Sequence, residues 1–116
     1  MRPLDGTLVL DASRMLPGAV LARLLIELGA RLIKIEHPAG GDPQRGAPPL
    51  VDGIGAGFRA FLAGSESLCL ELRDPRDAAR LRKLARQADL LVESFRPGSL
   101  ERFGLGVDLV PVLNIR

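Results

Sequence analysis

Several residues whose side chains can hold an anion or carry a proton stand at the end of short apolar runs. They are Asp11, His37, Arg73 and Glu93. An arginine can bind phosphate or carboxylate through charge-assisted hydrogen bonds, and histidine or carboxylate side chains can serve as general acids or bases. Polar residues are also ordinary occupants of surface loops, and Asp11 and Glu93 could simply cap the helices that follow them. The residue types alone therefore do not define an acid–base pair.

The composition gives little support for a cysteine nucleophile or for a metal site. The chain of 116 residues has one Cys and one His. A single cysteine excludes a disulfide within the chain, and zinc sites are usually built from several Cys and His ligands. Cys69 alternates with apolar residues in a predicted strand, which favours a small core residue over a reactive thiol. We therefore predict no metal site.

The first glycine-containing turn, DASRMLPG, does not support a classical dinucleotide site. It lacks the G-x-G-x-x-G fingerprint, and the chain has no P-loop sequence. Glu36 stands where an acid could bind a ribose, but without the glycines this signal is weak. The helix expected to begin near Gly18 could still offer backbone N–H groups to an anion.

Charge and hydropathy exclude further classes of function. The net charge is +2, and aromatic residues make up only 3% of the chain. Nucleic-acid binding would need a clustered basic patch and, for single strands, stacking platforms. No run of 18 apolar residues and no signal-type segment occurs in the sequence. We therefore expect no nucleic-acid partner, no membrane partner and a cytoplasmic location.

The apolar periodicity predicts alternating strands and helices. The predicted strands cover 7–10, 32–36, 67–72 and 90–93. Between the first two, apolar residues at helical spacing end at Gly29, a residue suited to terminate a helix. Asp74 and Pro75 open a second helix whose buried stripe is Ala78, Leu81, Leu84 and Ala85. A helical piece over 58–62, a short helix over 99–103 and a last helix capped by Asp108 complete the prediction.

This order predicts an open, mostly parallel Rossmann-like α/β sheet flanked by helices. Ligands of such sheets bind beyond the carboxyl ends of the strands. The loops expected at that rim include 11–18, 37–46 and 94–98, together with Arg73. His37, Arg45 and Arg73 are surface residues by default and become phosphate partners if they point into the crevice.

Four segments in order carry a family resemblance: PLDGTLVLDASRMLPG, LLIELGARLIKIEHPAGGDPQRGAPP, LCLELRDPRDAARLRKLARQADLLVESFRPGSLERFGLG and the closing LNIR. Together they cover nearly the whole chain. The sequence resembles the family III CoA-transferases, a group that includes formyl-CoA and carnitine CoA-transferases and the related alpha-methylacyl-CoA racemases. The resemblance implies an N-terminal CoA-binding α/β domain over residues 1–116, with the second domain and the catalytic segment outside this range.

The resemblance also implies where CoA would lie and how chains would pair. CoA would cross the carboxyl rim of the sheet, and members of the family form interlocked homodimers. The implied CoA contacts are Leu16, Pro17, His37, Arg45, Leu70, Leu72, Arg73, Ser94, Phe95 and Arg102. Two positions depart from the family pattern. An Asn-Lys-Arg-Ser segment is replaced by 63–67, which removes two basic groups, and Ser94 stands where the family has Asn.

No residue of the chain matches the catalytic groups of the family. The transferases carry the acyl group on an aspartate as a mixed anhydride, a form of covalent catalysis, and this aspartate lies after position 116, as do the acid and base of the racemases. We therefore expect no catalysis by the chain alone. The leading interpretation is the CoA-binding part of a transferase that moves CoA between carboxylic acids. Alternatives are a racemase-like fragment, a non-catalytic CoA or acyl-CoA binding module, a short chain that pairs with a separate chain carrying the rest, or a remnant without ligand.

Overall fold

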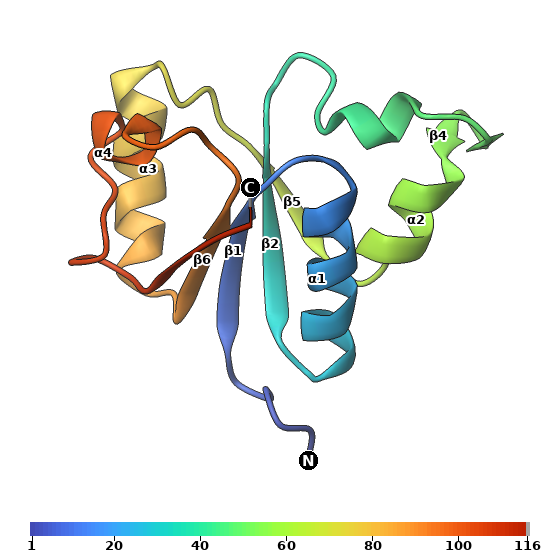
Figure 1. Cartoon of the computed structure of the whole chain (residues 1–116), viewed down its shortest axis with the longest axis horizontal. Coiled ribbons are helices and arrows are strands. Elements are labelled where there is room, and N and C mark those ends of the chain that lie inside the picture. Colours follow the sequence, from blue (N-terminus) through green and yellow to red (C-terminus); the bar gives the residue numbers. More distant parts are fainter. Residues whose placement is uncertain (116) are drawn as a thin grey trace.

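The computed structural model describes residues 1–115. Arg116, the last residue of the LNIR match, lies outside the described residues. The centre of the structure is a parallel sheet of five strands in the order β5-β2-β1-β6-β7. Its strands are β1 (Leu8–Ala12), β2 (Arg31–Glu36), β5 (Glu66–Cys69), β6 (Leu90–Glu93) and β7 (Val112–Asn114). The five strands of this sheet pair in parallel, and β1, β2 and β6 rise together in Figure 1, which confirms the predicted open parallel α/β fold.

The first β-α-β unit places helix α1 (Met15–Glu27) against the sheet. Its buried contact residues are small, namely Gly18, Ala19 and Ala22, so the helix approaches the strands closely. Gly29 ends the unit with φ 109°, a conformation that glycine adopts without steric cost. Of the larger apolar residues at helical spacing, Leu21 and Leu25 are half-buried against the core, whereas Val20, Leu24 and Leu28 are exposed. The predicted helix is therefore present, but small residues make most of its core contact.

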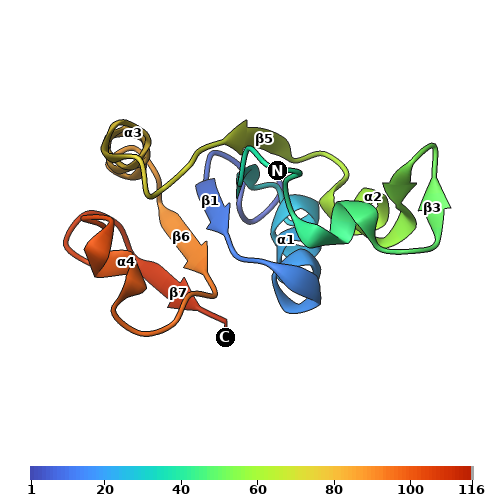
Figure 2. The same ribbon diagram turned by 90° about the horizontal axis from the view of Figure 1, so that it is seen from above.

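The opposite face of the sheet is covered by α3 (Pro75–Ala85) and the short α4 (Ser99–Arg102). Seen from above, these helices lie on one side of the sheet and α1 and α2 on the other (Figure 2). The Asp74 carboxylate accepts a hydrogen bond from the Arg76 amide at 2.9 Å, as expected for an N-cap. Leu81 and Ala85 are fully buried in the larger core cluster. The predicted cap and buried stripe of this helix are confirmed.

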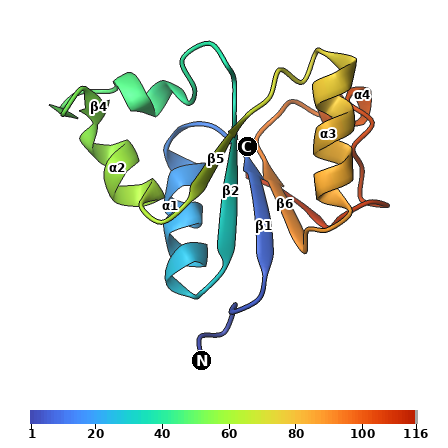
Figure 3. The ribbon, with the colours of Figure 1, turned by 180° about the vertical axis from the view of Figure 1, so that it is seen from behind.

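The segment between β2 and β5 contains more regular structure than its Gly and Pro content suggests. It forms a 3-10 helix η1 (Pro43–Gly46), a small hairpin of β3 (Leu50–Val51) and β4 (Ile54–Gly55), and helix α2 (Ala56–Leu62). A Cβ atom added at Gly55 would lie 2.2 Å from the backbone oxygen of Gln44. This close contact holds the start of α2 against η1, so the segment is a folded arm beside α1 (Figure 3).

Three sequence expectations are corrected by the fold. The last helix predicted after Asp108 is absent: 107–109 form a turn and the chain then enters β7, because pairing with β6 satisfies its backbone groups. Cys69 is exposed because β5 is an edge strand whose side chains all lie at the surface. Asp11 and Glu93 do not cap helices. Each accepts a hydrogen bond from an amide two residues later, Ser13 and Phe95 respectively.

No helix within residues 1–115 is long and apolar enough to cross a membrane.

Candidate functional site

A cavity of about 800 Å³ opens at the carboxyl ends of the strands. Loops that follow β1, β2, β5 and β6 meet there, which confirms the convergence predicted for this rim. The residues that line it are Ala12, Ser13, Arg14, Met15, Pro17, Ile35, Glu36, His37, Gly41, Asp42, Leu70, Glu71, Leu72, Arg73, Ser94, Phe95, Arg96, Ser99, Phe103 and Ile115. A cavity of this size is in the range that holds a cofactor-sized ligand.

One side of the cavity is apolar. Phe95 and Phe103 pack edge to face with ring centroids 5.9 Å apart. Leu70 and Leu72 follow β5 and line the same cavity. Aromatic and aliphatic groups such as these suit the flat or hydrocarbon part of a ligand.

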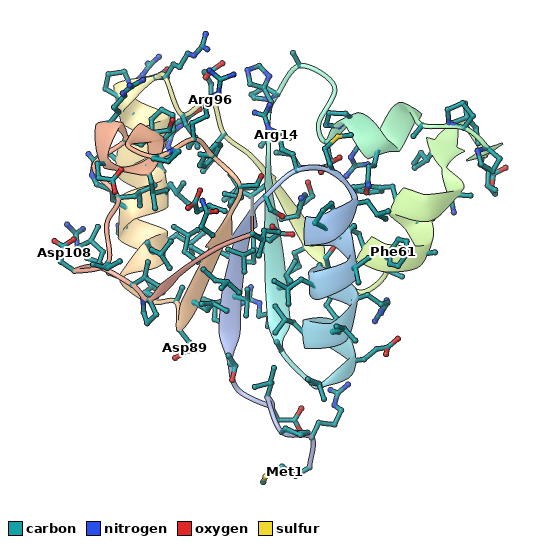
Figure 4. All side chains as sticks on the ribbon, viewed as in Figure 1. Met1, Arg14, Phe61, Asp89, Arg96 and Asp108 are labelled. Carbon is teal, nitrogen blue, oxygen red and sulfur yellow. The ribbon has the colours of Figure 1, made fainter. Side chains whose placement is uncertain are left out.

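Three arginines bring positive charge to the cavity. Arg14 follows β1, Arg73 follows β5 and Arg96 follows β6. Figure 4 shows Arg14 and Arg96 at the carboxyl end of the sheet. Among residues 1–115, none of the three forms a salt bridge, whereas most arginines of the helices and strands do. Their guanidinium groups are therefore available to an anionic ligand.

The imidazole of His37 is held by two neighbours. The Ala39 amide donates to Nδ1 at 3.0 Å, so Nε2 carries the proton and donates to the Glu71 carboxylate at 2.6 Å. The Arg73 backbone amide, and next the His37 hydrogen bond, lower the pKa of Glu71 below its usual range. In this arrangement His37 has no free donor, and a direct contact from His37 to phosphate would require the Glu71 bond to open.

Arg45 is engaged by a buried carboxylate. Its guanidinium donates to both oxygens of Glu36, at 2.8 Å for the shortest contact, and lies 4.2 Å from the centre of the Phe58 ring. Burial raises the pKa of Glu36, but hydrogen bonds from Arg45, Ser67 and the Asp42 amide outweigh it and bring the pKa below its ordinary value. Arg45 thus holds η1 against the end of β2 through Glu36. Arg45 does not line the cavity.

The structure brings together most of the residues that the resemblance singled out. Pro17, His37, Leu70, Leu72, Arg73, Ser94 and Phe95 all line the cavity. Leu16 lies on the exposed side of α1, outside it. Arg102 lines an adjacent cavity of about 490 Å³ that shares Leu72, Arg73 and Phe103 with the first. Their contacts with CoA remain predictions.

Two arginines of the cavity were not among the sequence-predicted contacts. Arg14 and Arg96 stand in the loops already assigned to the rim, DASRMLPG and SFRPG, so their position after a strand was a usable signal. The structure adds a link between these loops, because the Arg14 amide donates to Ser94 Oγ at 3.0 Å. The loops that follow β1 and β6 are therefore joined at the cavity.

Comparison with known sequences identifies related proteins over nearly the whole chain. The model of CoA-transferase family III matches residues 4–116. The chain is 40% identical over 114 residues to the acetyl-CoA:oxalate CoA-transferase of Acetobacter aceti, covering 98% of this chain and 29% of the relative. It is 37% identical over 115 residues to the succinyl-CoA–L-malate CoA-transferase beta subunit of Chloroflexus aurantiacus, covering 98% of this chain and 28% of the relative.

Solved structures agree with this assignment. A CAIB/BAIF family protein from Brucella suis superimposes with a TM-score of 0.82 at 35% identity, over 90% of this chain and 29% of that one. A hypothetical protein from Mycobacterium tuberculosis gives a TM-score of 0.83 at 35% identity, over 93% of this chain and 30% of that one. The chain thus spans less than a third of the length of these relatives. Because the family model matches almost every residue, the chain belongs to CoA-transferase family III.

Proposed function

We propose that residues 1–116 form the CoA-binding N-terminal α/β part of a transferase that moves CoA between carboxylic acids. The observation that carries the proposal is the cavity at the carboxyl rim, which combines an apolar wall with three arginines that form no salt bridge within residues 1–115. CoA has the matching parts, because its phosphates are anionic, its adenine ring offers flat faces that can pack on apolar side chains, and its pantetheine is an uncharged chain. Charge-assisted hydrogen bonds from guanidinium groups suit phosphate oxygens.

The beginning of α1 adds support for an anion at this place. Met15 and Pro17 line the cavity, and the first turn of α1 contains no acidic residue. The uncapped N–H groups at the start of a helix favour negative charge. Met15 has φ 70°, which is uncommon for a residue other than glycine and occurs here at the edge of the cavity. Such backbone conformations concentrate at functional sites.

Within this proposal the chain binds CoA, and the acyl chemistry belongs to residues beyond position 116. The family resemblance assigns the covalent step to an aspartate that these 116 residues do not contain. No residue of the chain is therefore proposed as catalytic, and the chain alone should not transfer CoA. A transfer activity measured with the 116-residue chain and no second polypeptide would contradict this assignment.

Arg73→Ala should weaken CoA binding by about 1–3 kcal/mol, because it removes a charged donor to phosphate. A loss of about 1.4 kcal/mol corresponds to tenfold in the dissociation constant. Arg102→Ala should weaken binding in the same direction through the adjacent cavity. Isothermal titration of CoA into the 116-residue chain measures both effects.

Arg80→Ala is the matched control for this titration. Arg80 lies on the exposed side of α3 and pairs with Asp77 at 2.5 Å, away from both cavities. The Arg80→Ala substitution should leave the dissociation constant for CoA unchanged. Absence of saturable CoA binding would argue for a remnant without ligand. Equal losses of affinity from Arg80→Ala and Arg73→Ala would argue that CoA is attracted only by the general positive charge of the chain.

We also propose that the chain acts in the cytoplasm. We further propose that it associates with a second copy or with a separate chain that supplies the remainder of the enzyme. Relatives from Chloroflexus aurantiacus are named as alpha and beta subunits. On α1, Leu16, Val20, Leu24 and Leu28 recur every fourth residue and are 40–54% exposed. Contiguous apolar surface of this kind seldom stays open on a monomer.

The purified chain should therefore self-associate. Size-exclusion chromatography with light scattering should give a mass above the 12.4 kDa of one chain, rising with concentration. A mass of one chain that does not change with concentration would contradict the expected association without affecting the proposed CoA site.

A further inference from the structure

A lysine is buried at the carboxyl end of β2. Lys34 pairs in register with Asp11 of β1, so the two side chains lie on the same face of the sheet. The side chain of Lys34 is only 2% exposed. Leu32, two residues earlier on this face, is an ordinary core residue. Because buried lysines are rare unless paired, the contacts of this ammonium group need a specific explanation.

The ammonium group binds three acceptors that come from three segments of the chain. Nζ lies 3.1 Å from Asp42 Oδ2 and 3.4 Å from Asp11 Oδ2, and it donates to the Ser13 backbone oxygen at 2.5 Å. Asp11 is the penultimate residue of β1, Ser13 belongs to the loop before α1, and Asp42 belongs to the loop before η1. A lysine has three N–H donors, so this set of acceptors uses its full capacity.

The partners of Lys34 in turn shape the wall of the cavity. Asp11 Oδ1 accepts from both the amide and the hydroxyl of Ser13, and Asp42 Oδ1 accepts from the Gln44 amide at 2.8 Å to begin η1. Ser13 and Asp42 line the cavity, whereas Lys34 does not. Arg14, which follows Ser13 in the chain, is one of the three arginines that line the cavity. Lys34 therefore contacts, from behind, two loops that would face a ligand.

The charges make this arrangement dependent on Lys34. One ammonium group stands between two buried carboxylates, Asp11 and Asp42. Burial raises the pKa of Asp11, and the nearby Lys34 charge together with the Ser13 hydrogen bonds opposes that rise. Without the lysine, Asp11 would lose its salt-bridge partner, and Asp42 would keep only the weaker electrostatic interaction with Arg45. Moving toward water would then be favourable for the segments that carry these two carboxylates.

We propose that Lys34 is a positioning residue for ligand binding: it holds the loops 12–14 and 38–42 against the sheet so that Arg14 and the cavity wall keep the geometry that CoA requires. This inference rests on the proposed CoA site for its ligand. The loop contacts of Lys34 can be measured without ligand. The role of Lys34 can therefore be tested even if the proposed CoA site proves wrong.

The binding experiment compares Lys34→Met with Leu32→Ala. Both changes affect a buried residue on the same face of β2, but only Lys34 contacts the cavity loops. At a temperature where both variants remain folded, Lys34→Met should raise the dissociation constant for CoA at least tenfold, and Leu32→Ala by less than twofold. Lys34→Arg keeps a cation and should recover part of the lost affinity. Equal affinities for the Met and Ala variants would overturn the proposal.

Hydrogen exchange of the full chain without ligand provides the second measurement. In Lys34→Met the amides of residues 13, 14, 42, 44 and 45 should exchange at least tenfold faster than in wild type, with α3 unchanged. If Lys34→Met does not fold, Asp42→Asn takes its place, because the amide oxygen still accepts from Gln44 while the charge that Lys34 binds is removed. Asp42→Asn should speed exchange of the amides of residues 41, 42, 44 and 45 and weaken CoA binding at least threefold. Unchanged exchange in these loops would overturn the proposed role of Lys34, whether or not the wild-type chain binds CoA. Absence of CoA binding by the wild-type chain would separately refute the proposed function.

Discussion

Leu10→Ala should lower the free energy of unfolding by about 2–5 kcal/mol, the range for removal of a fully buried leucine side chain. Leu10 lies in β1, the central strand of the sheet, and is 0% exposed within the cluster that α3 covers. The substitution leaves a cavity that the surrounding strands cannot close, because their spacing is set by backbone hydrogen bonds. Urea denaturation of both proteins followed by circular dichroism measures the difference.

Leu24→Ala is the same chemical change on an open surface and serves as the control. Leu24 of α1 is 54% exposed, and surface substitutions usually alter stability by less than about 0.5 kcal/mol. A large loss at Leu24 would mean that the apolar side of α1 is covered in solution, as self-association would produce. A small loss at Leu10 would contradict the position of the core.

Arg45→Ala should destabilise the chain by about 3 kcal/mol at pH 7, near the lower end of the cost of removing one partner of a buried ion pair. The Glu36 side chain is only 2% exposed and would keep its charge without a cationic partner, while Arg45 itself is partly exposed, which limits the loss. The contact of Arg45 with the Phe58 ring would also be lost. Urea titrations at several pH values measure the effect.

The Arg45 effect should depend on pH in a defined direction. The folded pKa of Glu36 is lowered, so the stability from this carboxylate is fully present above the ordinary glutamate pKa of about 4.3 and is lost as the pH falls through the folded value. The difference between wild type and Arg45→Ala should therefore shrink below about pH 4, leaving roughly 0.5–1 kcal/mol from the contact with Phe58.

Arg31→Ala is the matched control for this pair. Arg31 donates to Glu66 at 2.6 Å, but both side chains are more than half exposed. Exposed pairs contribute about 0–1 kcal/mol, so the loss should be small at every pH. A loss for Arg45→Ala that equals the Arg31→Ala value, or that persists unchanged at low pH, would contradict the buried pair.

The polar layer formed by Asp11, Lys34 and Glu36 links stability to the proposed site. These residues occupy the α1-side face of β1 and β2, where residues nearer the amino ends of the strands, such as Val9 and Leu32, are apolar. The face changes from apolar to ionic as the strands approach the cavity. Changes in this layer should therefore affect both the free energy of unfolding and the shape of the loops that face a ligand.

Local patterns were sufficient for much of the fold. The alternation of Leu32 to Glu36 predicts a strand, Asp74 and Pro75 predict the start of α3, and Gly29 predicts the end of the first helical unit. Patterns near the end of the chain were less informative. A polar residue such as Asp108 precedes turns as readily as helices, and β7 forms because β6 offers it unpaired backbone groups.

By itself, the sequence determined the order of the first four sheet strands and of the helices α1, α2, α3 and α4, the rim where loops meet and, through its motifs, the family. These follow from contacts between residues near in the chain and from the rule that parallel strands share one carboxyl edge. Only the tertiary structure decided how the charges are used. Arg45 binds Glu36, His37 binds Glu71 and Lys34 joins Asp11 to Asp42, while Arg14, Arg73 and Arg96 face the cavity. The physical reason is that ion pairing depends on strand register and loop approach, which bring together groups up to 35 positions apart.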